Sequence, residues 1–188
     1  MLKVALVGRP NVGKSTLFNR LVVSQKAIVN DLPGVTRDRK YGRASLADLN
    51  FILIDTAGID DSLIGSTETN IRKQSQIAIE DSNIIFFVID GREGVLPVEK
   101  SLAKDLKKQN KPIIVLINKS EGSRGLVGLS EAANLGFDNV IPISAEHGEG
   151  LPDLYDVLRD NLDDQNVNLT SCKSLSNVDC TPIRVSII

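Results

Sequence analysis

The sequence predicts an α/β fold with three layers, in which helices cover both faces of a mostly parallel six-stranded sheet that has one antiparallel edge strand. Apolar runs of high β-propensity alternate along the chain with segments of helical period. The runs at residues 84–89 and 113–117 are apolar throughout, and such strands need cover on both faces. Strands that alternate with helices in this way form a doubly wound sheet.

The first predicted strand, Leu2–Val7, leads directly into a glycine-rich loop. Residues 8–15 read GRPNVGKS, the phosphate-binding pattern G-x-x-x-x-G-K-[ST]. Its glycines let backbone N–H groups turn inward around phosphate oxygens, Lys14 supplies a point charge, and the Ser15 hydroxyl suits Mg²⁺. A helix over Lys14–Val23 then directs its positive end at the anion. An ordinary glycine turn, the alternative, needs no Lys-Ser pair. The predicted phosphate-binding residues are Gly8, Arg9, Pro10, Asn11, Val12, Gly13, Lys14, Ser15 and Thr16.

The remaining elements follow in order along the chain. A hairpin of Tyr41–Ala47 and Asn50–Ile54, turning at residues 47–50, supplies the antiparallel pair. The other predicted strands are Ile84–Ile89, Pro112–Ile117 and Val140–Ile143. The other predicted helices are Thr67–Asp81, Val98–Gln109, Gly128–Leu135 and Leu151–Leu162.

Polar residues follow the hairpin's second strand as Asp55-Thr56-Ala57-Gly58. In a doubly wound sheet, ligands bind beyond the carboxyl ends of the strands, so the chemistry is expected at such positions. Asp55 suits an Mg²⁺ ion held through a water, and Gly58 can offer a bare backbone N–H to a terminal phosphate. The alternative for Asp55 is an N-cap of the following segment.

Two further strand ends carry Asn118-Lys119-Ser120-Glu121 and Ser144-Ala145-Glu146. Asn118 and Lys119 can stack on and brace a base, while the Glu121 carboxylate accepts two N–H bonds from a purine edge. Guanine offers those donors at N1 and N2, and adenine does not. A solvated turn is the alternative for Asn118-Lys119. It would require that the polar groups at four strand ends point at one ligand by accident.

Five ordered motifs resemble those of the Era-like TRAFAC-class GTPases, and above all those of the Der (EngA) family. The motifs are GRPNVGKST at residues 8–16, PGVTRD at 33–38, DTAGI at 55–59, NKSE at 118–121 and SAEHGEG at 144–150. The resemblance implies a P-loop NTPase (Ras-like) fold and GTP hydrolysis. It also implies a first switch at residues 33–36, a second after Gly58, and Thr36 joining Ser15 and Asp55 on Mg²⁺ in the triphosphate state.

Two residues bear on the hydrolysis step. Ile59 stands where many small GTPases carry the Gln that orients the attacking water, and an alkyl side chain cannot polarise water. In similar GTPases an Asn at the place of Asn11 helps to bind K⁺. We therefore expect slow, potassium-stimulated hydrolysis in which Lys14, Thr36 and Gly58 are catalytic. A turn residue with no ion is the alternative for Asn11.

Glu121 departs from the familiar Asn-Lys-x-Asp pattern by one methylene group. The same two acceptor oxygens remain, so GTP is preferred over ATP in this prediction, with some loss of affinity. A P-loop ATPase or kinase without a ribosomal role is the alternative. It requires the motifs at Asn118–Glu121 and Ser144–Glu146 to be accidental.

Composition limits the other functions. A net charge of −2 does not predict nucleic-acid or membrane binding by this segment, and the sequence predicts a cytoplasmic chain with reduced cysteines at Cys172 and Cys180. No further Cys or nearby His completes a zinc site. His147 is predicted to be structural or at the surface. One basic cluster near the first switch could meet RNA phosphates or a partner, or be a solvated face: Arg37, Arg39, Lys40 and Arg43.

Three segments make up the predicted domain organisation: a GTP-binding domain at 1–163, a linker at 164–182 and a strand at 183–188. The order of residue types in Ile183–Ile188 matches that in Leu2–Val7, which indicates the first strand of a truncated second GTP-binding domain. The resemblance implies a tandem second domain and a KH-like domain, both missing from this chain. It implies a role in large-subunit ribosome assembly, with rRNA contacts through the full-length protein, either as an enzyme or as a switch that hydrolysis resets.

Overall fold

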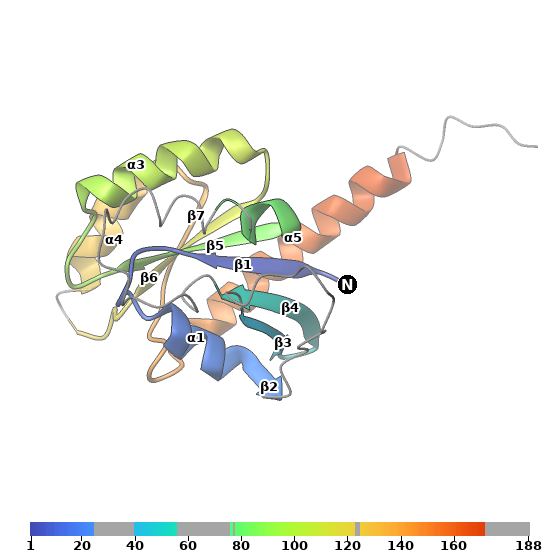
Figure 1. Ribbon diagram of the computed structural model, residues 1–188, viewed down its shortest axis with the longest axis horizontal. Helices are drawn as coiled ribbons and strands as arrows, with labels where there is room; N and C mark the ends of the chain where they lie inside the picture. Colours follow the sequence, from blue (N-terminus) through green and yellow to red (C-terminus); the bar gives the residue numbers. More distant parts are fainter. Residues whose placement is uncertain (25–39, 56–75, 77, 123–124, 172–188) are drawn as a thin grey trace, which may run out of the picture.

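The computed structural model describes residues 1–24, 40–55, 76, 78–122 and 125–171, with the backbone alone described for residues 24, 125–127 and 163–171. Helices and strands alternate along most of these residues (Figure 1). The elements are β1 (Lys3–Val7), α1 (Lys14–Leu21), β2 (Val22–Ser24), β3 (Lys40–Leu46), β4 (Leu49–Asp55), β5 (Ile84–Asp90), α3 (Pro97–Leu106), the 3-10 helix η2 (Lys107–Gln109), β6 (Ile113–Asn118), α4 (Gly125–Ala133), β7 (Asn139–Pro142) and α5 (Leu151–Ser171).

The strands form one sheet in the order β2-β3-β4-β1-β5-β6-β7. The five strands from β4 to β7 in this order pair in parallel, and β3 is antiparallel to both β2 and β4. The predicted hairpin is confirmed, since Leu46 pairs with Leu49 across a two-residue turn. The mostly parallel sheet is also confirmed, as is the α/β class.

The prediction of six strands with the antiparallel strand at the edge was wrong by one strand. Helix α1 ends at Leu21, because Val22 has an extended backbone (φ −78, ψ 115). Val22–Ser24 then forms β2, which pairs with β3 and makes a seventh strand in the described part of the chain. The β-branched side chains of Val22 and Val23 favour this extended conformation over a longer helix. The antiparallel strand β3 therefore lies one place in from the edge.

Apolar side chains pack on both faces of the sheet, as the continuous apolar runs require. One cluster joins the sheet to Leu17 and Leu21 of α1 and to Leu158 of α5. The other joins it to Leu102 of α3 and Ala132 of α4. Every residue of β5 is buried, and α3 lies on the opposite side of the sheet from α1 (Figure 1).

Two helical predictions changed in length. The helix predicted over Leu151–Leu162 continues to Ser171, and its last turns extend away from the sheet (Figure 1). Residues 164–171 of the predicted linker are thus helical, while residues 172–188 lie outside the described chain, so the domain boundaries stay predictions. Of the helix predicted over 67–81, residues 76 and 78–81 are described and are helical.

Candidate functional site

Strands β1, β4, β6 and β7 all end at one edge of the sheet, because they lie in its parallel part. Residues 8–13 follow β1, Asp55 ends β4, Asn118 ends β6, and Ser144 lies just beyond β7. The register sets Leu6 beside Asp55 and Asp90 beside Asn118. The fold thus brings together four of the predicted motifs.

The glycine-rich loop approaches its neighbours so closely that its two motif glycines have no room for a side chain. A Cβ on Gly8 would lie 2.3 Å from the Val88 carbonyl oxygen. A Cβ on Gly13 would lie 2.1 Å from Nδ2 of Asn118, and Gly13 also has φ +98, which favours glycine. Helix α1 begins directly after this residue. The loop and the first turn of the helix therefore form the wall of the site.

Lys14 lies across the loop, and its side chain is buried. Its ammonium donates hydrogen bonds to the carbonyl oxygens of Gly8, at 2.9 Å, and Arg9, at 2.6 Å. The next residue, Ser15, is exposed, and its hydroxyl donates to Oδ2 of Asp55 at 3.3 Å. Asp55 is buried with 1% of its surface exposed. Two of the predicted magnesium ligands therefore meet, one from α1 and one from β4.

Asn118 connects the loop to the segment that follows β7. Its Nδ2 donates to the Val12 carbonyl oxygen, and its Oδ1 accepts from the backbone N–H of Ala145, each at 2.8 Å. The residue is 2% exposed. Since both ends of the amide are bonded to other segments, the plane of this side chain is fixed.

Lys119 has a left-handed backbone (φ 63) and extends its side chain back over the loop. Its ammonium donates to the Asn11 carbonyl oxygen at 2.9 Å and to Oδ2 of Asp90 at 2.6 Å. Oδ1 of the same carboxylate accepts the backbone N–H of Arg92 at 2.9 Å. Asp90 therefore anchors two residues of the site from the end of β5.

A cavity of about 110 Å³ opens beside these residues. Its lining residues come from the loop and the first turn of α1, from the ends of β5 and β6, and from the segment after β7: Gly13, Thr16, Arg92, Asn118, Lys119, Glu121, Ser144 and Glu146. All but Arg92 were predicted to bind a nucleotide. Three of the sequence motifs thus converge on one small polar cavity.

Glu121 presents its carboxylate to this cavity. Oε1 accepts a hydrogen bond from the Arg92 guanidinium, while Oε2 is buried and has no hydrogen-bond partner among the described residues. The backbone N–H of Glu121, the Ser144 hydroxyl and the Arg92 guanidinium, in that order of effect, hold the pKa of this carboxyl below its usual value. The carboxylate is therefore ionised at neutral pH, with one buried oxygen available as an acceptor.

The segment after β7 forms a tight turn that Arg20 of α1 fastens to the body. The guanidinium of Arg20 donates to the carbonyl oxygens of Ala145 and Glu146. Within the turn, the backbone N–H of His147 donates to the Ser144 hydroxyl at 3.2 Å, and His147 itself is exposed. This position agrees with the prediction of a structural or surface role for His147.

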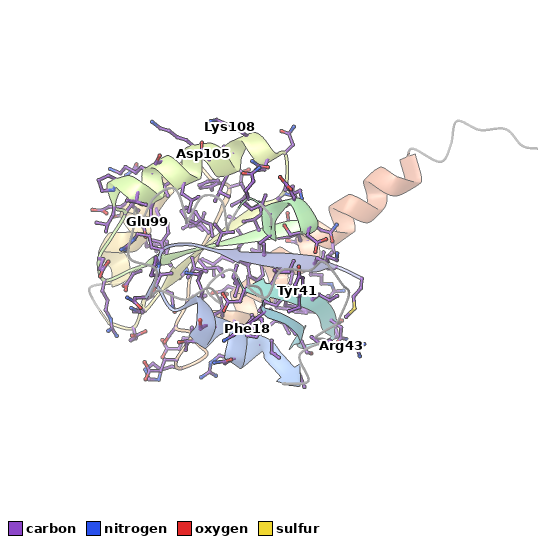
Figure 2. The ribbon with its side chains drawn as sticks, viewed as in Figure 1. Phe18, Tyr41, Arg43, Glu99, Asp105 and Lys108 are labelled. Atoms are coloured by element: carbon purple, nitrogen blue, oxygen red, sulfur yellow. The ribbon has the colours of Figure 1, made fainter. Side chains whose placement is uncertain are left out.

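The side chain of Arg9 extends away from the cavity, towards the start of α3. Its guanidinium bonds to Glu99 at 2.9 Å and to Glu93 at 2.6 Å, and Glu99, labelled in Figure 2, is fully buried. Burial opposes the charge of Arg9, but the hydrogen bonds and charges of the two glutamates outweigh it and raise the pKa. Only the backbone of Arg9 is thus placed to meet a phosphate.

Sequence reasoning missed Asp90, Arg92, Arg20 and Glu99. Asp90 could have been found, because it ends an apolar strand just as Asp55 and Asn118 do. The two arginines gave no signal, since Arg20 meets a segment that is 125 residues away along the chain.

Several predicted residues lie outside the described chain. They are Thr36, Thr56, Ala57, Gly58, Ile59, Arg37, Arg39, Cys172 and Cys180. Of the predicted basic cluster, Lys40 and Arg43 are described, and both are exposed on β3. Over the part of the chain that is described, no helix has the length and apolar character needed to cross a membrane.

Sequence comparisons place the chain among known GTPases. A family model described as "50S ribosome-binding GTPase" matches residues 3–119. GTPase Der of Parvibaculum lavamentivorans is 53% identical over 156 residues, which cover 83% of this chain and 33% of that protein. GTPase Der of Rhodopseudomonas palustris strain TIE-1 is 45% identical over 189 residues, covering 98% of this chain and 41% of that protein. The chain spans about a third to two fifths of the length of these curated relatives.

Solved structures give the same grouping. Era of Aquifex aeolicus, bound to GDP and AlF4−, has a TM-score of 0.63 and 32% identity over 83% of this chain and 55% of that one. The G domain of the T. maritima FeoB iron transporter has a TM-score of 0.65 and 28% identity over 86% of this chain and 99% of that one. The predicted P-loop GTPase fold is therefore confirmed.

Proposed function

The chain belongs to the family of 50S ribosome-binding GTPases, and we propose that it binds GTP, hydrolyses it slowly to GDP and phosphate, and acts as a nucleotide-dependent switch in large ribosomal subunit assembly. One observation carries this proposal. The glycine-rich loop, the Ser15–Asp55 pair and the Asn118–Glu121 segment lie at one edge of the sheet, and the loop and the Asn118–Glu121 segment line one polar cavity. A phosphate, a metal ion and a base can then be held at once.

Guanine is the proposed base because of the state of Glu121. Its ionised carboxylate accepts hydrogen bonds only, and the buried Oε2 has no partner among the described residues. Guanine donates from N1 and N2 on one edge and would satisfy that oxygen, whereas adenine lacks this pair of donors. Asn118 and Lys119 brace the base, and the backbone of the segment Ser144-Ala145-Glu146 closes over it.

Magnesium is the proposed metal. The Ser15 hydroxyl and Asp55 carboxylate are hard oxygen donors 3.3 Å apart, which is the chemistry that Mg²⁺ prefers. The ion would neutralise charge on the outer phosphates of GTP. Lys14 places its ammonium over the loop, where it is suited to contact the same phosphates. Thr36 and the backbone of Thr56, Ala57 and Gly58 complete the proposed set.

Potassium is proposed to assist hydrolysis through Asn11. This residue is exposed on the loop, and its amide oxygen is a suitable ligand for the ion. A cation there takes the electrostatic role of an arginine finger. Such help is needed because the alkyl side chain of Ile59 cannot orient the attacking water. Exchanging K⁺ for Na⁺ at constant ionic strength should lower turnover, and an unchanged rate would contradict this part of the proposal.

The ribosomal role rests on the relatives. The family description names the 50S ribosome, and the Der proteins are more than twice as long as this chain. We propose that the remainder holds a second GTP-binding domain and a KH-like domain, through which the full-length protein contacts rRNA in the cytoplasm. Single-turnover hydrolysis with and without large ribosomal subunits tests the switch.

Nucleotide binding is the most direct test. The chain is titrated with GDP and with ADP in the presence of Mg²⁺, and the dissociation constants are compared for the native protein, Glu121→Gln and the control Glu149→Gln. We expect the native chain and the control to prefer GDP. Removing the carboxylate should weaken GDP binding about 10- to 100-fold, which corresponds to the loss of a charged hydrogen-bond pair. Equal affinity of the native chain for GDP and ADP would contradict the guanine assignment and favour an ATPase or kinase.

A further inference from the structure

Arg92 contacts the carboxylate proposed to recognise the base. Its guanidinium donates to Oε1 of Glu121, and both residues line the same cavity. The side chains are 51% exposed for Arg92 and 23% exposed for Glu121. No motif includes Arg92, and the proposed function assigns it no role.

The backbone around Arg92 is fixed to the rest of the site. Oδ1 of Asp90 accepts its backbone N–H at 2.9 Å, and Oδ2 of the same side chain holds Lys119 at 2.6 Å. The preceding N–H, of Gly91, donates to the Asn118 carbonyl oxygen at 2.7 Å. The backbone at Arg92 is therefore held through Asp90 and Gly91, which also bond to Lys119 and Asn118, the residues proposed to brace the base.

Glu121 needs such a contact more than a shorter residue would. Compared with aspartate, glutamate has one more rotatable bond between its backbone and its carboxylate, so its acceptor oxygens sample more positions. Each freely rotating bond that must be fixed on binding lowers affinity. A charge-assisted hydrogen bond from Arg92 reduces that freedom before the nucleotide arrives.

We propose that Arg92 is a positioning residue for base recognition, which fixes the Glu121 carboxylate so that its second oxygen faces the purine. The inference rests on the proposed role of Glu121 in binding guanine. The division of the two oxygens supports it: Arg92 occupies Oε1, and Oε2 stays buried without a partner in the described part of the chain. If Arg92 instead competed with the base for Glu121, it would occupy the carboxylate oxygen to which the base is proposed to bond.

Because the pair is partly exposed, its direct contribution to stability is small. Its effect should appear in binding and base selection. Without nucleotide, Arg92→Ala should leave the melting temperature unchanged. A purely structural role would lower the melting temperature first.

The test is a double-mutant cycle on GDP binding with Mg²⁺ present. Arg92→Ala is made in the native chain and in the E121D background, and titration calorimetry gives the dissociation constants for GDP and ADP. In the native chain we expect GDP binding to weaken about 10-fold, with less discrimination against ADP, whereas in the E121D background the change should be at most about 2-fold. The shorter side chain has less freedom to fix.

Controls separate the possible outcomes. Arg92→Lys should give an intermediate loss, because a single ammonium fixes the carboxylate less well than a guanidinium. Arg43→Ala, an exposed arginine on β3, should change nothing. Equal losses in both backgrounds would mean that Arg92 contacts the nucleotide directly, and tighter GDP binding would mean that it competes for Glu121; either result overturns the inference. Equal affinity of the native chain for GDP and ADP would instead contradict the proposed function itself.

Discussion

Asn118 and Ser15 lie in opposite halves of the site and are held in different ways. Asn118, in the base half, is buried and bonds through its amide to both the glycine-rich loop and the segment after β7. Ser15, in the phosphate half, is exposed, and its hydroxyl makes a 3.3 Å bond to Asp55. Asn118 therefore joins two segments of the fold in addition to its proposed role in binding. Ser15 contributes much less to holding the fold together.

This difference separates stability from function. A change at Asn118 should lower the free energy of unfolding before any nucleotide is added, because it leaves buried polar groups without partners. A change at Ser15 should affect turnover alone. Each of the following predictions tests one side of this comparison.

Asn118→Ala should have the largest effect on stability. It leaves the Val12 carbonyl oxygen and the Ala145 N–H without their partner, and unfolding free energy should fall by about 3 kcal/mol. Urea denaturation without nucleotide measures the loss. The control is Asn134→Ala, an exposed residue just after α4 that bonds to the Ser130 carbonyl oxygen of that helix and should change stability by less than about 0.5 kcal/mol. Equal stability of the two variants would show that Asn118 does not join the segments.

Ser15→Ala should separate activity from folding. Loss of the proposed magnesium ligand should lower GTP turnover about 100-fold, while the free energy of unfolding should change by no more than about 0.5 kcal/mol. Phosphate release at several Mg²⁺ concentrations and urea denaturation give the two values. Ser45→Ala removes a similar 3.3 Å hydroxyl bond in the β3–β4 hairpin and is the matched control. Retained turnover in Ser15→Ala would remove this residue from the metal site.

Asp90→Asn should have a moderate effect on both properties. The neutral amide keeps the shape but loses the charge that holds Lys119, so GDP binding should weaken about 5-fold and unfolding free energy should fall by about 1 kcal/mol. Calorimetry and urea denaturation check the two changes. Asp105→Asn is the control: its partner Lys108, which lies on η2 next to α3, is exposed (Figure 2), and such pairs contribute little. Unchanged GDP binding would mean that Lys119 needs no anchor.

The sequence predicted the phosphate half and the base half because both lie at strand ends, where apolar runs stop and polar residues begin. Asp55 and Asn118 were found by that rule. The short strand Val22–Ser24 was not, because three residues directly after a helix cannot be told from its last turn by periodicity. The end of α5 was missed because residues 163–171 lack the apolar stripe that indicates a helix, although they are helical in the structure.

The contacts that fix the site were harder to predict than its residues. Arg20 meets Ala145, and Arg92 meets Glu121, across 125 and 29 positions of the chain. Neither arginine lies in a motif, and an exposed basic residue is common on any surface. Such partners depend on the path of the folded chain, so only the structure shows them.

The acid response of Glu121 should be the smallest of the effects. The folded chain holds the pKa of this carboxyl below its usual value, first through its own backbone N–H and then through Ser144 and Arg92. A depressed pKa adds stability that is present above the unfolded value and is lost as the pH falls through the folded value. Relative to Glu121→Gln, the native chain should therefore keep a constant advantage between about pH 7 and 5.5 and lose it below about pH 4.5. Urea denaturation of both chains across this range measures the difference, and an advantage that grows on acidification would mean that the carboxylate is destabilised by its surroundings.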